Sequence, residues 1–312
     1  MKVFVAGATG AIGSRLVDQL IRRGHHVSGT TRTPAKIERL RALGADPVLL
    51  DALDASAVKA AVADAEPDVI VHELTAIPDV VDPRRLDAGF VATNRLRTEG
   101  TDHLLEAARA VGVRRFVAQS FAMWAYAREG AAVKSEGDAL EGDPPASVRQ
   151  TLAGILHVER AVAAVADVEG IALRYGSFYG PGTSLARGAP LVGLVRKRRL
   201  PIVGSGEGVW SFIQIDDAAS ATVAAVERGA PGIYNVADDE PASVATWLPE
   251  LAHAVGAPAP RRVPTWLARP LIGDAGVAMM TEVRGASNAK AKRGLGWEPR
   301  YPTWREGFRS GL

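Results

Sequence analysis

The chain has 312 residues and contains no cysteine. This absence excludes disulfide bonds, thiolate metal sites and a cysteine nucleophile, and it permits a reducing compartment. Long hydrophobic runs are missing as well, since no stretch approaches the roughly 18 apolar residues of a membrane span. The first apolar run ends at Gly7, which is typical of a first β-strand and not of a signal peptide. We therefore expect a cytoplasmic protein that does not act at a membrane.

A strong excess of charge is also missing. The 37 Lys and Arg residues face 35 Asp and Glu residues, so the formal net charge is only +2. Such a small excess gives no reason to expect a nucleic-acid partner, and the basic residues 196–199 are predicted to be a solvated helix end. No metal-ligand spacing is present, and Asp216 with Asp217 is predicted to cap a helix. We expect a small-molecule substrate and a monomer or homodimer.

The most informative motif that is present opens the chain. A short apolar strand, Val3–Ala6, leads into glycines at positions 7, 10 and 13, and a helix is predicted over 14–23. Such glycines permit a tight turn, a close approach of backbone to a pyrophosphate and close packing of helix on strand. The N-terminus of the helix then attracts phosphate. The motif predicts a dinucleotide site formed by Gly7, Thr9, Gly10, Ala11, Ile12 and Gly13.

Strand and helix patterns alternate through the first half of the chain, which predicts an α/β fold with a doubly wound parallel (Rossmann) sheet. Strands are expected at 3–6, 27–31, 47–50, 68–72, 115–119 and 171–174, with helices at 34–43, 55–65, 94–111 and 147–168. Two later strands are expected at 210–215 and 232–236, the second in the main sheet. Gly and Pro cluster after residue 174. We predict a nucleotide domain from 1–176 and 211–237, and a smaller substrate lobe from 177–210 and 238–312.

The end of the second predicted strand bears on the choice of cofactor. A site selective for NAD places an acid roughly 20 residues beyond the glycines, where it binds the ribose. Here the residues are Thr31 and Arg32, and the next acid is Glu38, inside the following helix. A guanidinium can instead hold a 2′-phosphate, assisted by the Thr31 hydroxyl and Lys36. This pattern predicts NADPH rather than NADH, although Arg32 as a plain solvated residue is the alternative.

Several further motifs give a resemblance that runs nearly end to end. Beside the glycine motif they are Asp51–Asp54, Val71–Ala76, Asn94 with Gly100 and Thr101, 173–182 and 212–217. In this order they resemble the extended branch of the short-chain dehydrogenase/reductase superfamily, the branch of sugar-nucleotide epimerases and dehydratases. The resemblance implies that Asp51 and Ala52 contact the adenine. It also implies that the nicotinamide is bordered by Leu74, Thr75, Ala76, Tyr175, Gly176 and Ser177.

The same resemblance implies a catalytic Ser/Thr, Tyr and Lys, with the last two spaced as Tyr-x-x-x-Lys, yet no such spacing occurs in this chain. The matching positions hold Thr151 and Ile155. An aliphatic hydroxyl is a far weaker acid than a phenol, so Thr151 cannot replace the tyrosine. The usual second serine is Phe121, and only Ser120 remains. Ser120 and Thr151 are candidates for orienting substrate, and for Ser120 the capping of a strand end is equally open.

These substitutions suggest a reaction that takes no proton from the protein. Hydride transfer requires a well-placed nicotinamide and an electrophile, and the proton can come from the substrate or from water. Phe121, Met123 and Trp124 would make the pocket apolar and suited to a flat aromatic ketone. We therefore predict an NADPH-dependent ketoreductase for a bulky, polyketide-like aromatic substrate, similar to angucyclinone ketoreductases that lack the tyrosine. The alternatives are a non-catalytic NADP-binding regulator and a sugar-nucleotide epimerase or dehydratase.

Three further side chains are candidates for proton transfer. His72 is expected at the end of the fourth strand in a buried structural role. Glu73 is either a base near the nicotinamide or a carboxylate that faces solvent. His157 lies two residues after Ile155 and therefore points away from the cofactor.

Overall fold

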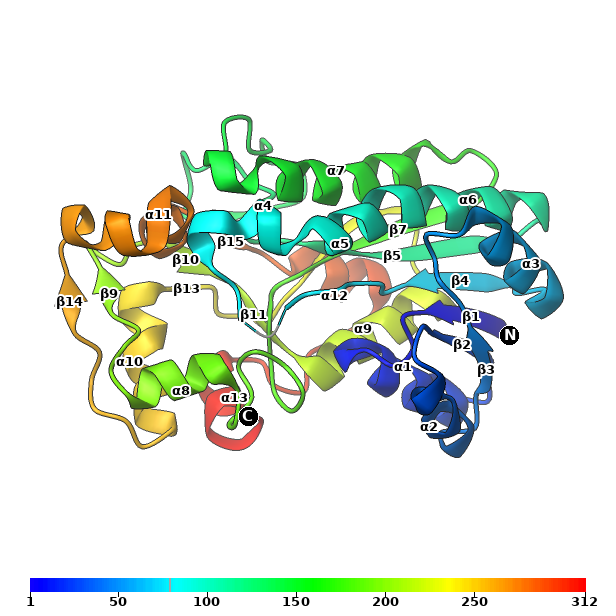
Figure 1. Ribbon diagram of the computed structural model, residues 1–312, viewed down its shortest axis with the longest axis horizontal. Coiled ribbons are helices and arrows are strands. Elements are labelled where there is room, and N and C mark those ends of the chain that lie inside the picture. Colours follow the sequence, from blue (N-terminus) through cyan, green and yellow to red (C-terminus); the bar gives the residue numbers. More distant parts are fainter. Residues whose placement is uncertain (79) are drawn as a thin grey trace.

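The computed structural model of the protein describes residues 1–78 and 80–312. Its centre is a seven-stranded sheet in which every pairing is parallel, as predicted (Figure 1). The strands follow the order β12 (Gly232–Val236), β7 (Glu169–Tyr175), β5 (Arg115–Phe121), β4 (Val69–His72), β1 (Lys2–Ala6), β2 (His26–Thr31) and β3 (Asp46–Leu49). The expected late strand at 232–236 does join this sheet, beside β7.

Helices cover both faces of the sheet because successive side chains of a strand point to opposite faces. In β1, Val3 and Val5 pack in one core together with α1 (Ala11–Arg22), α9 (Ile215–Glu227) and α12 (Ala289–Leu295). Phe4 and Ala6 pack in the other core, against α3 (Ala55–Ala65), α6 (Thr101–Ala110) and α7 (Arg149–Ala164). Figure 1 shows α6 and α7 on one side of the sheet and α1 and α9 on the other. The doubly wound fold follows directly from this alternation.

A third hydrophobic core holds the left-hand part of Figure 1 together. It is rich in aromatic rings that contact one another, namely Trp210, Phe212, Trp247, Trp304 and Phe308. The surrounding helices are α8 (Pro190–Arg196), α10 (Val244–Ala254), α11 (Thr265–Thr281, kinked at Gly273) and α13 (Trp304–Ser310). We call this part the lobe; the exact domain boundaries expected from the sequence stay a prediction.

Short strands and helices complete the chain. The two-stranded pairs are β6 (Val133–Lys134) with β15 (Gly285–Ala286), β8 (Ser177–Tyr179) with β11 (Phe212–Gln214), β9 (Ile202–Val203) with β14 (Arg262–Val263), and β10 (Val209–Trp210) with β13 (Ala242–Ser243). The short helices are η1 (Pro34–Lys36), α2 (Ile37–Ala42), η2 (Pro83–Arg85), α4 (Leu86–Gly89), α5 (Val91–Arg95) and η4 (Ala146–Val148). The basic residues 196–199 are exposed where α8 ends, as expected.

The structure corrects three local expectations. The long helix at 94–111 is interrupted, because a π-helical segment, η3 (Leu96–Gly100), separates α5 from α6. The strand expected at 210–215 divides at Ser211 into β10 and β11, and Ile215 already belongs to α9. The cap of α9 is the side chain of Gln214, which accepts hydrogen bonds from the N–H groups of the two aspartates. Asp216 and Asp217 therefore occupy the first turn and are not the cap.

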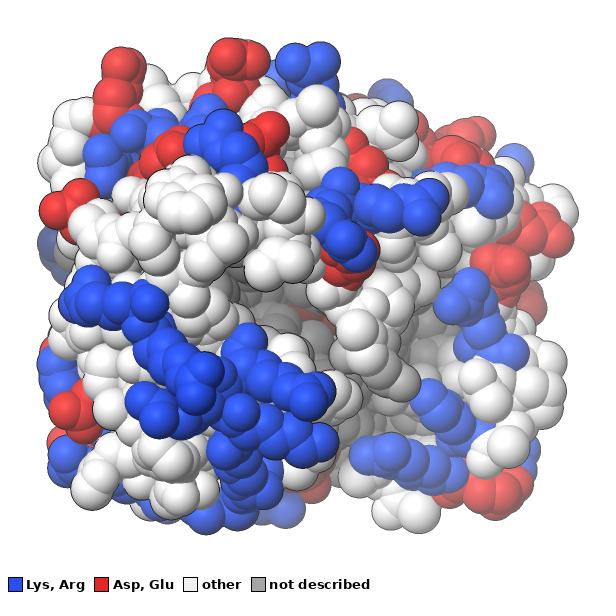
Figure 2. Space-filling view, turned by 60° about the vertical axis from the view of Figure 1, so that its left-hand side comes forward, with Lys and Arg blue, Asp and Glu red and all other residues white. Residues whose placement is uncertain are grey.

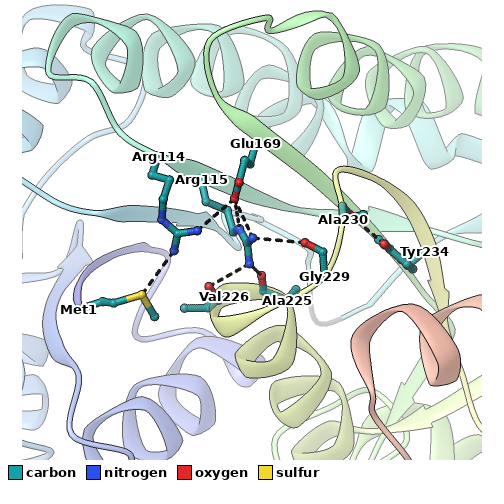
Figure 3. Close-up of polar contacts among 9 residues, drawn as sticks. All are labelled: Met1, Arg114, Arg115, Glu169, Ala225, Val226, Gly229, Ala230 and Tyr234. Carbon is teal, nitrogen blue, oxygen red and sulfur yellow. Dashed lines mark hydrogen bonds and ion pairs between the residues drawn. The ribbon is translucent and has the colours of Figure 1, made fainter.

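The amino-terminal edge of the sheet is closed by a buried arginine (Figure 3). Nε and Nη2 of Arg115 donate to Glu169 at 2.9 and 2.7 Å. The same guanidinium also donates to the backbone carbonyls of Ala225, Val226 and Gly229. These contacts tie the starts of β5 and β7 to the end of α9.

Candidate active site

The carboxyl-terminal edge of β1 has the shape of a dinucleotide cradle. Gly7 has a φ of +94°, and a Cβ there would lie 2.8 Å from the carbonyl oxygen of Glu73. A Cβ on Gly13 would lie 2.1 Å from the carbonyl oxygen of Gly7. The cap of α1 is Gly10, which offers no side-chain hydrogen bond, so the N–H groups of the first turn are available to phosphate. These residues fit a dinucleotide pyrophosphate.

Two threonine hydroxyls at the end of β2 form hydrogen bonds with this cradle. Thr30 Oγ1 accepts the Gly7 N–H at 3.0 Å, and Thr31 Oγ1 accepts the Thr9 hydroxyl at 3.2 Å. Arg32 and Lys36 beyond it are exposed, and within residues 1–78 and 80–312 neither forms an ion pair. The structure thus presents two uncommitted cations after β2, whereas their role toward a 2′-phosphate stays a prediction.

Asp51 and residues 74–76, for which the resemblance implies cofactor contacts, have internal hydrogen bonds, whereas their role toward a cofactor stays a prediction. Asp51 is exposed, and its Oδ1 accepts the Leu53 N–H at 3.0 Å; Ala52 behind it is buried. The N–H of Leu74 donates to His72 Nδ1 at 3.2 Å, and that of Ala76 donates to Thr93 Oγ1 at 3.0 Å. Side chains of β4 and α5 therefore fix the backbone of 74–76.

His72 has the buried structural role that the sequence predicts. Its Nε2 lies 3.0 Å from Thr101 Oγ1 and 3.3 Å from the carbonyl oxygen of Leu96. Burial lowers the pKa of His72 to about 4, and the charge of nearby Arg97 adds to this effect. The imidazole is therefore neutral at physiological pH and ties β4 to the π-helical segment.

Glu73 does not face solvent, which resolves one of the two readings left open. It is 3% exposed; its Oε1 accepts the Tyr175 hydroxyl at 3.0 Å, and that hydroxyl lies 2.6 Å from Thr222 Oγ1. Its Oε2 is buried and has no partner among the described residues. Burial raises the pKa of Glu73 to about 8, so the group is mostly protonated at neutral pH. Tyr175 is likewise committed to this contact beneath the glycine turn.

The two positions of the missing pair are both occupied in other ways. Thr151 is 4% exposed, and its hydroxyl donates to Asp87 Oδ1 at 2.8 Å. The backbone N–H groups of Gln150 and Thr151 donate to the same carboxylate. Ile155 is fully buried. Thr151 thus anchors the first turn of α7 to α4, and neither position offers an acidic proton.

Ser120 donates a hydrogen bond to a buried ion pair, Glu159 with Arg174, that sequence reasoning missed. Its hydroxyl donates to Glu159 Oε1 at 2.6 Å, and Arg174 donates to both oxygens of Glu159 at 2.6 Å. Arg174 also donates to the Tyr126 hydroxyl at 2.9 Å, and Tyr126 in turn donates to Asn235 Oδ1. Because its proton is engaged, Ser120 closes the polar network at the end of β5. A contact of Ser120 with substrate stays a prediction.

The expected apolar pocket residues divide into two groups. Trp124 is 4% exposed and belongs to the core of the lobe, whereas Phe121 and Met123 are half-buried against that core. Gly176 is confined, since a Cβ there would lie 2.8 Å from the carbonyl oxygen of Ser211, and the N–H of Ser177 donates to that oxygen.

Figure 2 shows a deep hollow in the middle of one face, with Lys and Arg side chains gathered beside it.

Arg97 is the second side chain that sequence reasoning missed. It is 7% exposed, and burial lowers its pKa to about 10. Among the described residues its guanidinium forms one hydrogen bond, which Nη1 donates to Asn94 Oδ1 at 3.5 Å. Arg97 precedes Thr101 and Leu104 by four and seven positions, which is the spacing of a buried helix face. That spacing is the signal that would have found it.

Other expectations concern the surface. His157 lies 2.7 Å from Asp102 in a half-exposed contact, away from the site residues above. Within the part of the chain that the structure describes, no three His, Cys, Asp or Glu side chains gather as a metal site requires. Across the same residues, no helix combines the length and apolar character needed to cross a membrane.

Comparison with known proteins identifies the family to which the chain belongs. Residues 3–237 match the model of the NAD dependent epimerase/dehydratase family. The chain is 47% identical, over 99% of both chains, to a 3-diazoavenalumate denitrifying reductase of a Streptomyces species. It is 27% identical to a 4-hydroxy-2-methyl-3-oxo-4-farnesyl-3,4-dihydroquinoline-1-oxide ketoreductase of Stigmatella aurantiaca, over 82% of this chain and 74% of the relative.

A solved structure shows the same fold. The human epimerase family protein SDR39U1, crystallised with NADPH, superposes with a TM-score of 0.75 at 19% identity, covering 99% of this chain and 98% of that one. The family match covers most of the chain and includes the glycine cradle and the strands that carry it. The protein therefore belongs to the NAD dependent epimerase/dehydratase family, the extended short-chain dehydrogenases/reductases.

Proposed function

We propose that this protein is a nicotinamide-dependent reductase whose hydride acceptor requires no proton from the enzyme. Its substrate would be an aromatic carboxylate that carries a diazonium group, which hydride replaces on the ring with release of dinitrogen. The observation that carries the proposal is that Thr151 and Ile155 occupy the positions of the proton-relay Tyr and Lys. The chain is also 47% identical to a 3-diazoavenalumate denitrifying reductase. Family membership supports the coarser description as an oxidoreductase.

The balance of the reaction explains why the relay can be absent. Reduction of a ketone consumes one hydride and one proton, so an acid must quench the alkoxide. An aryl diazonium and one hydride give the arene and dinitrogen: the carbon–nitrogen bond breaks, a carbon–hydrogen bond forms, and no proton is consumed. Bound nicotinamide supplies the two electrons as hydride. Loss of the Tyr and Lys would therefore cost this chemistry nothing.

The residues of the site have defined tasks in this proposal. The glycine cradle and the N-terminus of α1 bind the pyrophosphate, and the backbone of 74–76, fixed by His72 and Thr93, borders the nicotinamide. Phe121 and Met123 supply half-buried apolar surface on which an aromatic ring can pack. The neutral state of His72 and the engaged hydroxyls of Ser120 and Thr151 are consistent with a site that donates no proton.

NADPH is the cofactor that we propose. Arg32 and Lys36 are exposed beyond β2, and the nearest acid along the chain, Glu38, is paired with Arg41. The family description names NAD, so this preference depends on the residues of this chain alone.

The reduction of a ketone on a bulky aromatic substrate is the second candidate. The relative from Stigmatella aurantiaca is a ketoreductase of a ring-bound ketone. In this case the proton would come from water or from a hydroxyl of the substrate. A sugar-nucleotide epimerase is disfavoured because its chemistry begins with removal of a hydroxyl proton, for which neither Thr151 nor Ile155 is suited.

The deciding experiment follows NADPH oxidation by the purified protein with two substrates. One is a diazonium derivative of an aromatic carboxylate, and the other is an aromatic ketone of matched size. We expect one molecule of dinitrogen for each NADPH oxidised, above the background measured with heat-denatured protein. Turnover of the ketone without dinitrogen release would favour the second candidate. If NADPH binds tightly but neither compound reacts, the proposal fails and a regulator becomes the better description.

A further inference from the structure

Arg97 is a buried cation for which the described residues provide no counter-ion. Arg97 is 7% exposed, and no carboxylate of the described residues lies within ion-pair distance of its guanidinium. The only hydrogen bond that its guanidinium donates there goes to the neutral amide of Asn94, at the long distance of 3.5 Å. Four of its five N–H groups therefore have no partner in the described part of the chain. None of its nitrogens is among the fully buried polar atoms that lack a partner, so these N–H groups are accessible to a small molecule.

Such a group is costly to bury. A desolvated charge is normally paired or hydrogen-bonded throughout, because the interior repays little of the lost hydration. Burial alone already lowers the pKa of Arg97 to about 10. A protein that retains this arrangement gains from it elsewhere, and the simplest gain is a ligand that brings the missing negative charge.

The position of Arg97 indicates which ligand this is. Arg97 lies on the π-helical segment η3, and such segments are frequent at functional sites. Its charge reaches His72 at the carboxyl end of β4, the edge at which ligands bind in α/β sheets. A Cβ on Gly154 would lie 3.5 Å from Cβ and from Cδ of Arg97. Gly154 follows Thr151 by three positions, on the helix face that has lost the relay.

The cofactor's pyrophosphate does not account for this charge. Its cradle leads into α1, which packs on one face of the sheet, whereas η3 packs on the opposite face against α7. The nicotinamide end of the cofactor is not anionic. Of the two ligands that the proposed function requires, the substrate is therefore the better source of negative charge at this position.

We propose that Arg97 binds the carboxylate of the aromatic substrate and so selects acids over neutral analogues. This inference deepens the proposed function, because it assigns the carboxylate of that substrate class to a residue. A guanidinium binds a carboxylate through two parallel hydrogen bonds, and the free N–H groups of Arg97 permit this. Asn94, which lies within hydrogen-bond distance of both Arg97 and Thr151, would hold the guanidinium in place.

The test measures binding and not turnover. Cinnamate and its neutral amide, cinnamamide, are titrated into the protein with and without NADP⁺, using calorimetry. The wild type should bind cinnamate more tightly than cinnamamide, and Arg97→Met should reduce that preference by roughly 10- to 100-fold. Arg97→Lys should restore part of it, since the ammonium keeps the charge but not the paired geometry. Circular dichroism checks that each variant is folded.

A matched control is available two residues away. Arg95 is exposed and pairs with Glu99, so Arg95→Met should leave the acid-to-amide ratio unchanged. If the wild type does not prefer the acid, or if Arg97→Met keeps the preference, the inference is wrong. Loss of the preference in a protein that releases no dinitrogen would leave Arg97 as a carboxylate site and refute the proposed reaction, so the two failures are distinguishable.

Discussion

Three arginines lie buried at the central sheet, and they differ in what surrounds them. Arg115 at the amino-terminal edge donates to Glu169 and to three carbonyls (Figure 3). Arg174 is held by both oxygens of Glu159 and by Tyr126. Arg97, near the carboxyl-terminal edge, donates within the described part of the chain only a long hydrogen bond to Asn94. A buried cation with internal partners holds the fold together, whereas one without them is available to a ligand.

The same contrast extends to other groups. Glu73, at the end of β4, keeps one buried oxygen without a partner among the described residues, and Arg32, after β2, forms no ion pair there. These groups lie where parallel strands end, which is where α/β proteins bind their ligands. Polar groups without a protein partner among the described residues are thus present at the edge that the proposed function uses.

Removing the partner of a paired buried arginine should have the largest effect on stability. Glu159→Ala leaves Arg174 buried and uncompensated, and we expect a loss of about 3–5 kcal/mol in the free energy of unfolding, measured in urea. Glu99→Ala is the control, because that carboxylate forms an exposed ion pair with Arg95, and its loss should change the free energy of unfolding far less. Equal effects of the two substitutions would contradict the structural role of Glu159.

The buried acid gives a test through pH. Because burial raises the pKa of Glu73 to about 8, the folded state keeps a proton that the unfolded state releases above its lower pKa. The stability that this proton provides is complete below the unfolded pKa and is lost as pH rises through 8. Between pH 6 and 9 this loss is about 3 kcal/mol. Glu73→Gln should flatten this part of the profile of melting temperature against pH; an unchanged slope would show that Glu73 is ionised in the fold.

The exposed cation after β2 tests the choice of cofactor. Arg32→Ala should raise KM for NADPH by roughly 10- to 100-fold, because it removes a charge-assisted contact with the 2′-phosphate, and should leave KM for NADH nearly unchanged. Arg39→Ala, an exposed cation on α2, is the control and should affect neither. A parallel rise for both cofactors would instead indicate damage to the fold.

The position of the missing tyrosine should matter less. Thr151→Ala removes a hydroxyl that donates to Asp87 but no acid, so more than about a tenth of the activity should remain, measured as kcat with the substrate that the protein turns over. Removal of a true general acid costs roughly 100-fold or more, and a loss of that size would mean that Thr151 does supply the proton. Thr151→Ser keeps the contact with Asp87 and serves as the control.

The smallest effect on stability is expected for Arg97, the buried arginine that lacks a counter-ion among the described residues. Arg97→Met should change the free energy of unfolding of the ligand-free protein by no more than about 1 kcal/mol, or should raise it, because the desolvation cost of an unpaired charge is removed. Thermal unfolding without ligand measures this. A loss as large as that of Glu159→Ala would show that Arg97 has partners in the fold and would end the contrast.

Much of the architecture could be predicted from local patterns. The glycines at 7, 10 and 13, the alternation of strands and helices and the late strand at 232–236 depend on backbone geometry and on periodic burial, which neighbouring residues express. The predicted ends of individual helices and strands were wrong where contacts between distant segments decide them. Ser211, for example, carries hydrogen bonds to Ala286, and the π-helical turn at Leu96–Gly100 sets Arg97 against Gly154.

By itself the sequence determined the class of fold, the dinucleotide cradle and the absence of a Tyr and Lys relay, because each is a matter of which residues stand at which spacing. Only the tertiary structure decided which polar groups are satisfied. Ser120 is engaged by Glu159, which is 39 positions away, and Thr151 by Asp87, which is 64 positions away. Pairing and desolvation depend on distance in space, and spacing along the chain does not contain that distance.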